Sequence, residues 1–206
     1  MPLETTPSLK AEELDDLIYF ARVGDLDALR SSISQLSNAH SSPAAIIIEA
    51  AIDEEVDESE PSSECSLLHW PAANGNEEIL SYLLSVLGSN QPLVEATAKP
   101  VSSLVNHKNK NGNTPLHWAA VNGHISCVKA LLAAGADPAI TNNAGHDALY
   151  EADCSGKQGG EEVAEWILAN CAGLEKGLNG NDVSAEAAAD DVVEAEDVMG
   201  DEPNAT

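Results

Sequence analysis

The stretch NKNGNTPLHWAAVNGHISCVKALLAAGAD, residues 109–137, decides the fold because it holds the start and stop signals of two short helices. Thr114 is a good helix N-cap, and Pro115 follows at the first helical position, where a missing N–H costs nothing. Asn122-Gly123 ends the first helix, and Gly135 ends the second. The apolar stripe of the second helix consists of Ile125, Val128, Leu131 and Leu132. The stretch therefore predicts a helix–turn–helix unit followed by a loop.

The TPLH-x-A pattern at residues 114–119 resembles the ankyrin repeat. Leu116 and Leu149 lie 33 residues apart, which is the ankyrin period, and Asp147 takes the capping place of Thr114 in this later copy. Upstream, LHWPAANG at residues 68–75 parallels LHWAAVNG at residues 116–123, although Pro71 removes one backbone hydrogen bond inside that helix. We therefore expect an all-α ankyrin-repeat solenoid of about four repeats, two of them full and two of them degenerate caps.

The expected domain boundaries follow from these copies and from the composition between them. A flexible N-terminus (1–10) precedes the ankyrin-repeat domain (11–172), and an acidic disordered tail (173–206) follows it. Within the domain we expect a cap (11–36), an acidic insertion (37–64), a repeat (65–87), a long loop (88–105), a repeat (106–138) and a terminal repeat (139–172). The insertion begins with a segment that favours a short helix, AAIIIEAAI, and ends in an acidic run that favours a mobile loop.

The charge of the chain is strongly acidic, with 35 Asp and Glu against 9 Lys and Arg and a formal net charge of −26. This excess disfavours direct binding to nucleic acid and favours a basic protein partner. The four cysteines form no CxxC pair and are interpreted as reduced thiols. No N-terminal basic and apolar leader appears, and no apolar run approaches the length of a membrane span, so we expect a soluble intracellular protein. We also expect it to be a monomer.

The expected partner-binding face is formed by the first helices and the loop tips, which line the concave side of stacked ankyrin units. By position it comprises Tyr19, Arg22, Val23, Trp70, Ala73, Asn74, Lys110, Asn111, Asn113, Trp118, Val121, Asn122, His146 and Glu151, with Cys154 and Ser155 beside them. Further acidic contacts to a partner are expected from Asp53, Glu54, Glu55, Asp57 and Glu58.

Trp70 and Trp118 occupy the same site in successive repeats, so their rings should lie side by side. Two interpretations stay open at this point. The indoles either pack against neighbouring loops, or they anchor a partner helix, since Trp is common among interface hot spots.

Catalytic and metal sites are not expected. Cys65 and His69 are four residues apart, and His124 and Cys127 are three apart, so each pair could share a helical face. Neither pair has further ligands at a supporting spacing, and no third group to orient a Cys–His nucleophile is apparent. We expect no enzymatic activity, no metal and no cofactor.

A more specific resemblance rests on ADPAITNNAGHDALYEADCSGKQ, residues 136–158, together with NKNGNTPLHWA before it. With the acidic insertion and tail, this pattern resembles the fungal ankyrin-repeat chaperones dedicated to the third protein of the small ribosomal subunit. The resemblance implies a non-enzymatic escort that binds this basic protein, shields its RNA-binding surface, prevents its aggregation and serves small-subunit assembly in the cytoplasm and the nucleus. The alternative is a generic ankyrin scaffold for a signalling or transcription partner, which need not be basic.

Overall fold

The computed structural model describes residues 7–53, 62–89 and 103–171. Its elements are α1 (Ala11–Val23), α2 (Leu26–His40), α3 (Ala44–Ala50), α4 (His69–Asn74), α5 (Glu77–Ser89), the 3₁₀ turn η1 (Ser103–Asn106), α6 (Pro115–Val121), α7 (Ile125–Ala133), α8 (Ala148–Cys154) and α9 (Gly160–Asn170). The described part of the chain has no strand, only an isolated antiparallel bridge between Ile52 and Ser66. The predicted all-α fold is confirmed.

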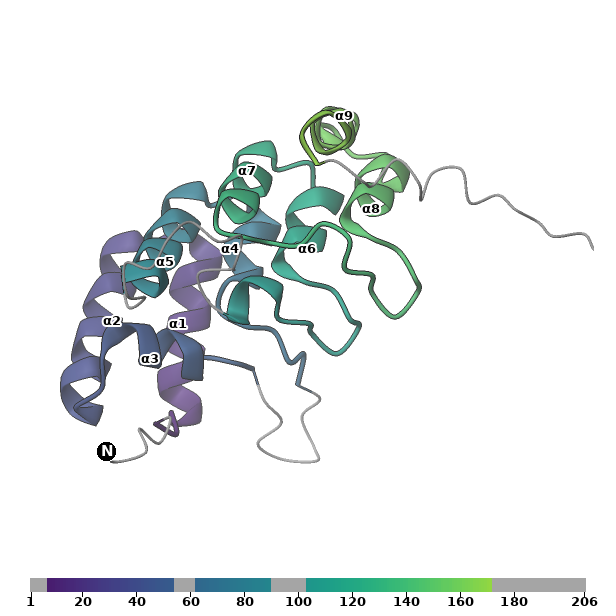
Figure 1. Cartoon of the computed structure of the whole chain (residues 1–206). Coiled ribbons are helices and arrows are strands. Elements are labelled where there is room, and N and C mark those ends of the chain that lie inside the picture. The colour runs from purple at the N-terminus through teal and green to yellow at the C-terminus, as the bar shows by residue number, and fades with distance from the viewer. Residues whose placement is uncertain (1–6, 54–61, 90–102, 172–206) are drawn as a thin grey trace, which may run out of the picture.

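The helices form two rows that advance together across the molecule (Figure 1). The first-helix row is α1, α4, α6 and α8, in which each helix contacts the next. The second-helix row contains α2, α5, α7 and α9, and each of these packs on its own first helix. This arrangement is an ankyrin solenoid, in which each repeat buries its apolar faces against its neighbours.

The helix ends follow the local sequence, as in α6. Thr114 is its N-cap, Pro115 opens it, and Gly123 just beyond it has a φ of +73°. Asp147 caps α8 by accepting a hydrogen bond from the Tyr150 N–H at 2.8 Å. The caps predicted from the repeat pattern at these two helices are confirmed.

The expected insertion at 37–64 differs from a simple interruption of the array. Its first residues complete α2, which ends at His40 and therefore outlasts the expected end of the cap at residue 36. The short helix predicted from AAIIIEAAI is confirmed as α3, which contacts both α2 and α5. Ile47 and Ile48 are fully buried there. Tertiary packing thus places α3 between α2 and α5 of the second-helix row, between the cap and the first full repeat.

Pro71 does not remove a hydrogen bond from the helix interior as expected, because α4 begins only at His69. Pro71 is consequently the third residue of the helix, where its missing N–H leaves no interior hydrogen bond broken. The matching helix α6 opens at Pro115, the counterpart of Leu67, so the cost of Pro71 is a later start of α4.

The hydrophobic core is continuous through all repeats, from Leu17 in α1 to Ile167 in α9. It is built almost entirely from Leu, Ile, Val and Ala, as the scarcity of aromatic residues required. Among the described helices, none has the length and apolar character needed to cross a bilayer.

Candidate partner-binding face

The first-helix row is held in register by two buried histidines. In His69, Nδ1 accepts from the N–H of Ser66 at 3.1 Å, and Nε2 donates to the carbonyl oxygen of Asn113 in the next repeat at 3.0 Å. His117 repeats the arrangement, accepting from the N–H of Thr114 and donating to a carbonyl of the following repeat. Burial lowers the pKa of His69 from 6.5 to about 4 and lowers the pKa of His117 as well. Both rings are therefore neutral clamps between repeats.

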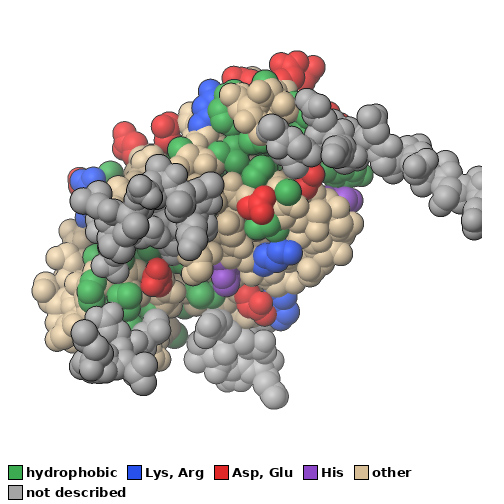
Figure 2. Space-filling model, viewed as in Figure 1, with side chains coloured by type: hydrophobic (Ala, Val, Ile, Leu, Met, Phe, Trp, Pro, Cys, Tyr) green, Lys and Arg blue, Asp and Glu red, His purple; other side chains and the backbone are tan. Residues whose placement is uncertain are grey.

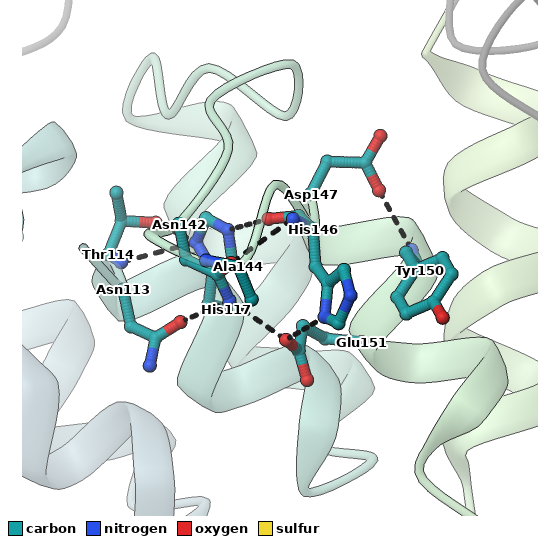
Figure 3. A network of polar contacts seen from close by, with 9 residues as sticks. All are labelled: Asn113, Thr114, His117, Asn142, Ala144, His146, Asp147, Tyr150 and Glu151. Atoms are coloured by element: carbon teal, nitrogen blue, oxygen red, sulfur yellow. Dashed lines mark hydrogen bonds and ion pairs between the residues drawn. The ribbon is translucent and has the colours of Figure 1, made fainter. Parts of the chain in front are cut away.

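A polar network links the central repeat to the terminal one (Figure 3). The Asn142 amide donates to Asn113 Oδ1 and to Glu151 Oε1, each at 2.8 Å. Glu151 Oε1 also meets His146 Nδ1 at 3.1 Å. The Tyr150 ring lies over the His146 ring with centroids 4.0 Å apart. The network satisfies the side chains of the loop tip and fixes its shape.

Four residues expected to contact a partner are thus already engaged within the protein. Asn113, His146 and Glu151 belong to this network, and the Asn111 carbonyl oxygen accepts from Asn143 N–H at 3.0 Å. Lys110 is exposed at the loop tip, where its backbone joins Ser63. These internal hydrogen bonds hold the loop tips of adjacent repeats together.

The two tryptophans lie against each other, as their equivalent positions predicted. The rings of Trp70 and Trp118 are 5.5 Å apart between centroids and meet edge to face at 76°. Trp118 also packs on the His69 ring at 5.3 Å, and the Arg22 guanidinium lies over Trp70 at 4.9 Å. Trp70 Nε1 is buried and has no hydrogen-bond partner within the described residues. Both residues are half-buried, so each packs against its neighbours and remains partly accessible at the surface.

The expected contacts at the N-terminal end of the row surround one hollow between α1 and α4, of about 660 Å³. Its lining consists of Asp15, Ile18, Tyr19, Arg22, Val23 and Asn74. The Asn74 side chain also donates to the Arg22 carbonyl oxygen at 2.9 Å, tying the two helices together. Asp15 and Ile18 were missed from the sequence, although their spacing from Tyr19, Arg22 and Val23 places all five on one face of α1.

The remaining expected contacts are dispersed. Ala73 and Val121 are half-buried, and the Ala73 carbonyl oxygen accepts from His124 Nε2. The Asn122 side chain bonds to the Trp118 carbonyl and to Lys157. Asp53 is half-buried and accepts from the N–H and hydroxyl of Ser63, while Glu54, Glu55, Asp57 and Glu58 lie outside the described residues.

Of the two cysteine–histidine pairs, Cys65, His69 and Cys127 are buried and His124 is half-buried. His69 and His124 donate to backbone carbonyls, and Cys65 and Cys127 are fully buried. Burial raises the pKa of the Cys127 thiol to about 11 and also raises that of Cys65, so both thiols stay protonated near neutral pH. Among the described residues, no three His, Cys, Asp or Glu side chains are grouped to hold a metal ion.

Among the described residues, Asp and Glu outnumber Lys and Arg. Figure 2 shows acidic side chains gathered over α9 at the top of the view, where Glu161, Glu162 and Glu165 are exposed. Several cations are turned onto aromatic rings, which are the pairs Arg22–Trp70, Arg30–Tyr82 and Lys129–Trp166. The first-helix row itself offers the half-buried rings of Trp70 and Trp118 and the exposed carboxylates of Asp15 and Asp16, a combination that suits a basic protein.

Comparisons with known proteins agree with this geometry. Residues 17–142 and 68–179 match the family model for ankyrin repeats in three copies. The ankyrin repeat-containing protein YAR1 of Saccharomyces cerevisiae is 37% identical over 169 residues, covering 82% of this chain and 74% of the yeast protein. Palmitoyltransferase Hip14 of Drosophila melanogaster is 37% identical over 95 residues, but these cover 13% of that protein.

A chain in the crystal structure of the yeast ribosomal protein Rps3 in complex with its chaperone Yar1 has the same fold. It superposes with a TM-score of 0.63 at 35% identity, covering 78% of this chain and 94% of that chain. Repeat pattern, stacked helices and similarity along most of both sequences coincide. The chain therefore belongs to the ankyrin-repeat family, as a relative of yeast Yar1.

Proposed function

We propose that this protein is a dedicated chaperone of the small-subunit ribosomal protein Rps3, which it binds and shields until the ribosomal subunit is assembled. The observation that carries the proposal is the match to the Rps3–Yar1 complex, which extends over 94% of the matched chain. Yeast YAR1, aligned over 74% of its length, supports the same role, whereas the short match to a palmitoyltransferase does not support that enzyme's activity.

The charge of the chain gives this role a physical basis. Ribosomal proteins carry basic surfaces for RNA, and a net charge of −26 attracts such a surface and competes with phosphate for it. Association should then be fast at low salt and weaken as salt rises. The role needs no catalytic step, and the buried, protonated thiols of Cys65 and Cys127 agree with a binding protein.

As part of the same proposal, the chaperone accompanies its client from the cytoplasm into the nucleus. The 9 Lys and Arg of the sequence form no basic cluster of the kind used for nuclear import. The complex would therefore enter on the basic signals of the client.

The test is complex formation between the purified full chain and purified yeast Rps3. We expect a one-to-one complex in size-exclusion chromatography at about 50 mM salt, weaker binding at about 300 mM, and suppression of Rps3 light scattering by the chain. Hen lysozyme, a basic protein of unrelated fold, is the matched control for charge. Failure to bind Rps3, or equal affinity for lysozyme, would contradict a dedicated chaperone.

A further inference from the structure

The hollow between α1 and α4 is lined in part by apolar side chains that remain largely exposed. Tyr19 is 60% exposed and Val23 is 56% exposed. With Tyr150, they are the exposed large hydrophobic side chains of the described chain, and only these two border the hollow. Neighbouring apolar residues of the same helix, Leu17 and Ala21, are fully buried. The exposure is therefore confined to one face of α1, next to α4 (Figure 1).

The hollow has a negative charge at one end and a positive charge at the other. Asp15 and Arg22 both line it, and their separation of seven residues places them about 10 Å apart along the axis of α1. At one end, Arg22 lies over the Trp70 ring. At the other end, the exposed carboxylates of Glu12 and Asp16 accompany Asp15. A partner group in the hollow therefore meets an acidic end and an apolar middle.

We propose that this hollow receives an apolar side chain of the basic client, and that a neighbouring Lys or Arg of the same client segment pairs with Asp15. The proposal rests on the proposed function and adds where the client is held and in which direction. The ring of Tyr19 and the side chains of Ile18 and Val23 cover the apolar group. The carboxylate end fixes the position of the cation, and Arg22 repels it from the other end. Charge complementarity with a protein of net charge −26 selects this occupant over a neutral one.

The apolar part is tested with Tyr19→Ser and the double variant Tyr19→Ser/Val23→Ser in the full chain, with affinity for yeast Rps3 measured by calorimetry. Loss of a central interface contact predicts at least about tenfold weaker binding for the double variant. Gln35→Ser is the control, since Gln35 is an exposed, uncharged side chain of α2 in the second-helix row. Because these side chains are exposed, the midpoint temperature of thermal unfolding of each variant should stay close to that of the wild type.

The electrostatic part is tested with Asp15→Asn against Asp27→Asn, an exposed carboxylate in α2. Asp15→Asn should weaken binding by about threefold at low salt and have little effect at high salt, whereas Asp27→Asn should leave affinity within about twofold.

Distinct outcomes separate the site from the proposed function. If the wild type binds Rps3 and the Tyr19/Val23 double variant binds within about twofold of it, the hollow is not the client site and the chaperone role stands. An equal loss of affinity for Gln35→Ser would also overturn the site. If the wild type does not bind Rps3, the proposed function fails and the proposed occupant fails with it.

Discussion

Protonation of His69 should limit the stability of this protein in mild acid. The ring is buried between repeats, with Nδ1 accepting from the Ser66 N–H and Nε2 donating to the Asn113 carbonyl oxygen. A second proton on Nδ1 would face that N–H donor in a site without solvent. Burial accordingly lowers the pKa of His69 from 6.5 to about 4.

The sign and size of the effect follow from proton linkage. Because the folded pKa lies below the unfolded one, the unfolded chain takes up the proton first as pH falls. The contribution of His69 is therefore complete above about pH 6.5, decreases between about 6.5 and 4, and levels off below. Between pH 8 and pH 5 these two pKa values predict a loss of about 2 kcal/mol in the free energy of unfolding.

The measurement is urea denaturation at pH 8 and pH 5, followed by tryptophan fluorescence, for the wild type and for His69→Gln. The variant should be less stable at pH 8, but its additional loss at pH 5 should be smaller than that of the wild type by about 2 kcal/mol. His117→Gln should reduce the loss in the same direction, since burial lowers the pKa of that ring too. An equal pH 8 to pH 5 loss in the wild type and His69→Gln would refute the reasoning.

Further predictions concern the turns, the cap and the tryptophans, each measured by urea denaturation at pH 8. Gly123→Ala should lower the free energy of unfolding by more than about 2 kcal/mol, because φ is +73° and the new Cβ would collide with the backbone just before α9. Gly145→Ala should lower it by about 1 kcal/mol, because φ is +82° but the space around the new Cβ is open. Equal costs would contradict the close approach. Asp147→Ala should remove about 1 kcal/mol through the lost N-cap, and an unchanged midpoint would contradict it. Trp118→Ala should lower the free energy of unfolding by about 2 kcal/mol, because its packing on Trp70 is lost. Unchanged stability together with reduced binding of the client would contradict this and indicate that Trp118 serves only as an anchor for the partner.

Much of the fold could be predicted because ankyrin repeats depend on local signals. Thr114 and Asp147 are caps whose hydroxyl or carboxylate satisfies N–H groups a few residues away, so sequence spacing alone places them. The role of α3 could not be predicted in this way. Its apolar residues Ile47 and Ile48 are buried only because α2 and α5 leave room between them, which is a property of packing.

The candidate site shows the same division. Equivalent positions in successive repeats predicted that Trp70 and Trp118 would meet, but not that a guanidinium would cover one of them. Asn113 and Glu151 were expected to face a partner, and the structure shows that both are hydrogen-bonded in the loop network, while their contact with a partner stays a prediction. Polar side chains of a loop can form hydrogen bonds with an adjacent repeat or with a partner, and the relative placement of the repeats decides which internal hydrogen bonds form.

The sequence by itself determined the repeat, its period, the helix ends and the acidic character of the protein, because each depends on residue type and local spacing. Only the tertiary structure decided which exposed groups converge. Asp15, Tyr19 and Val23 share a face of α1, but they line a hollow only because α4 stands beside that face at the right distance. The hollow is formed by two helices, and the distance between them is set by packing rather than by the sequence of either helix.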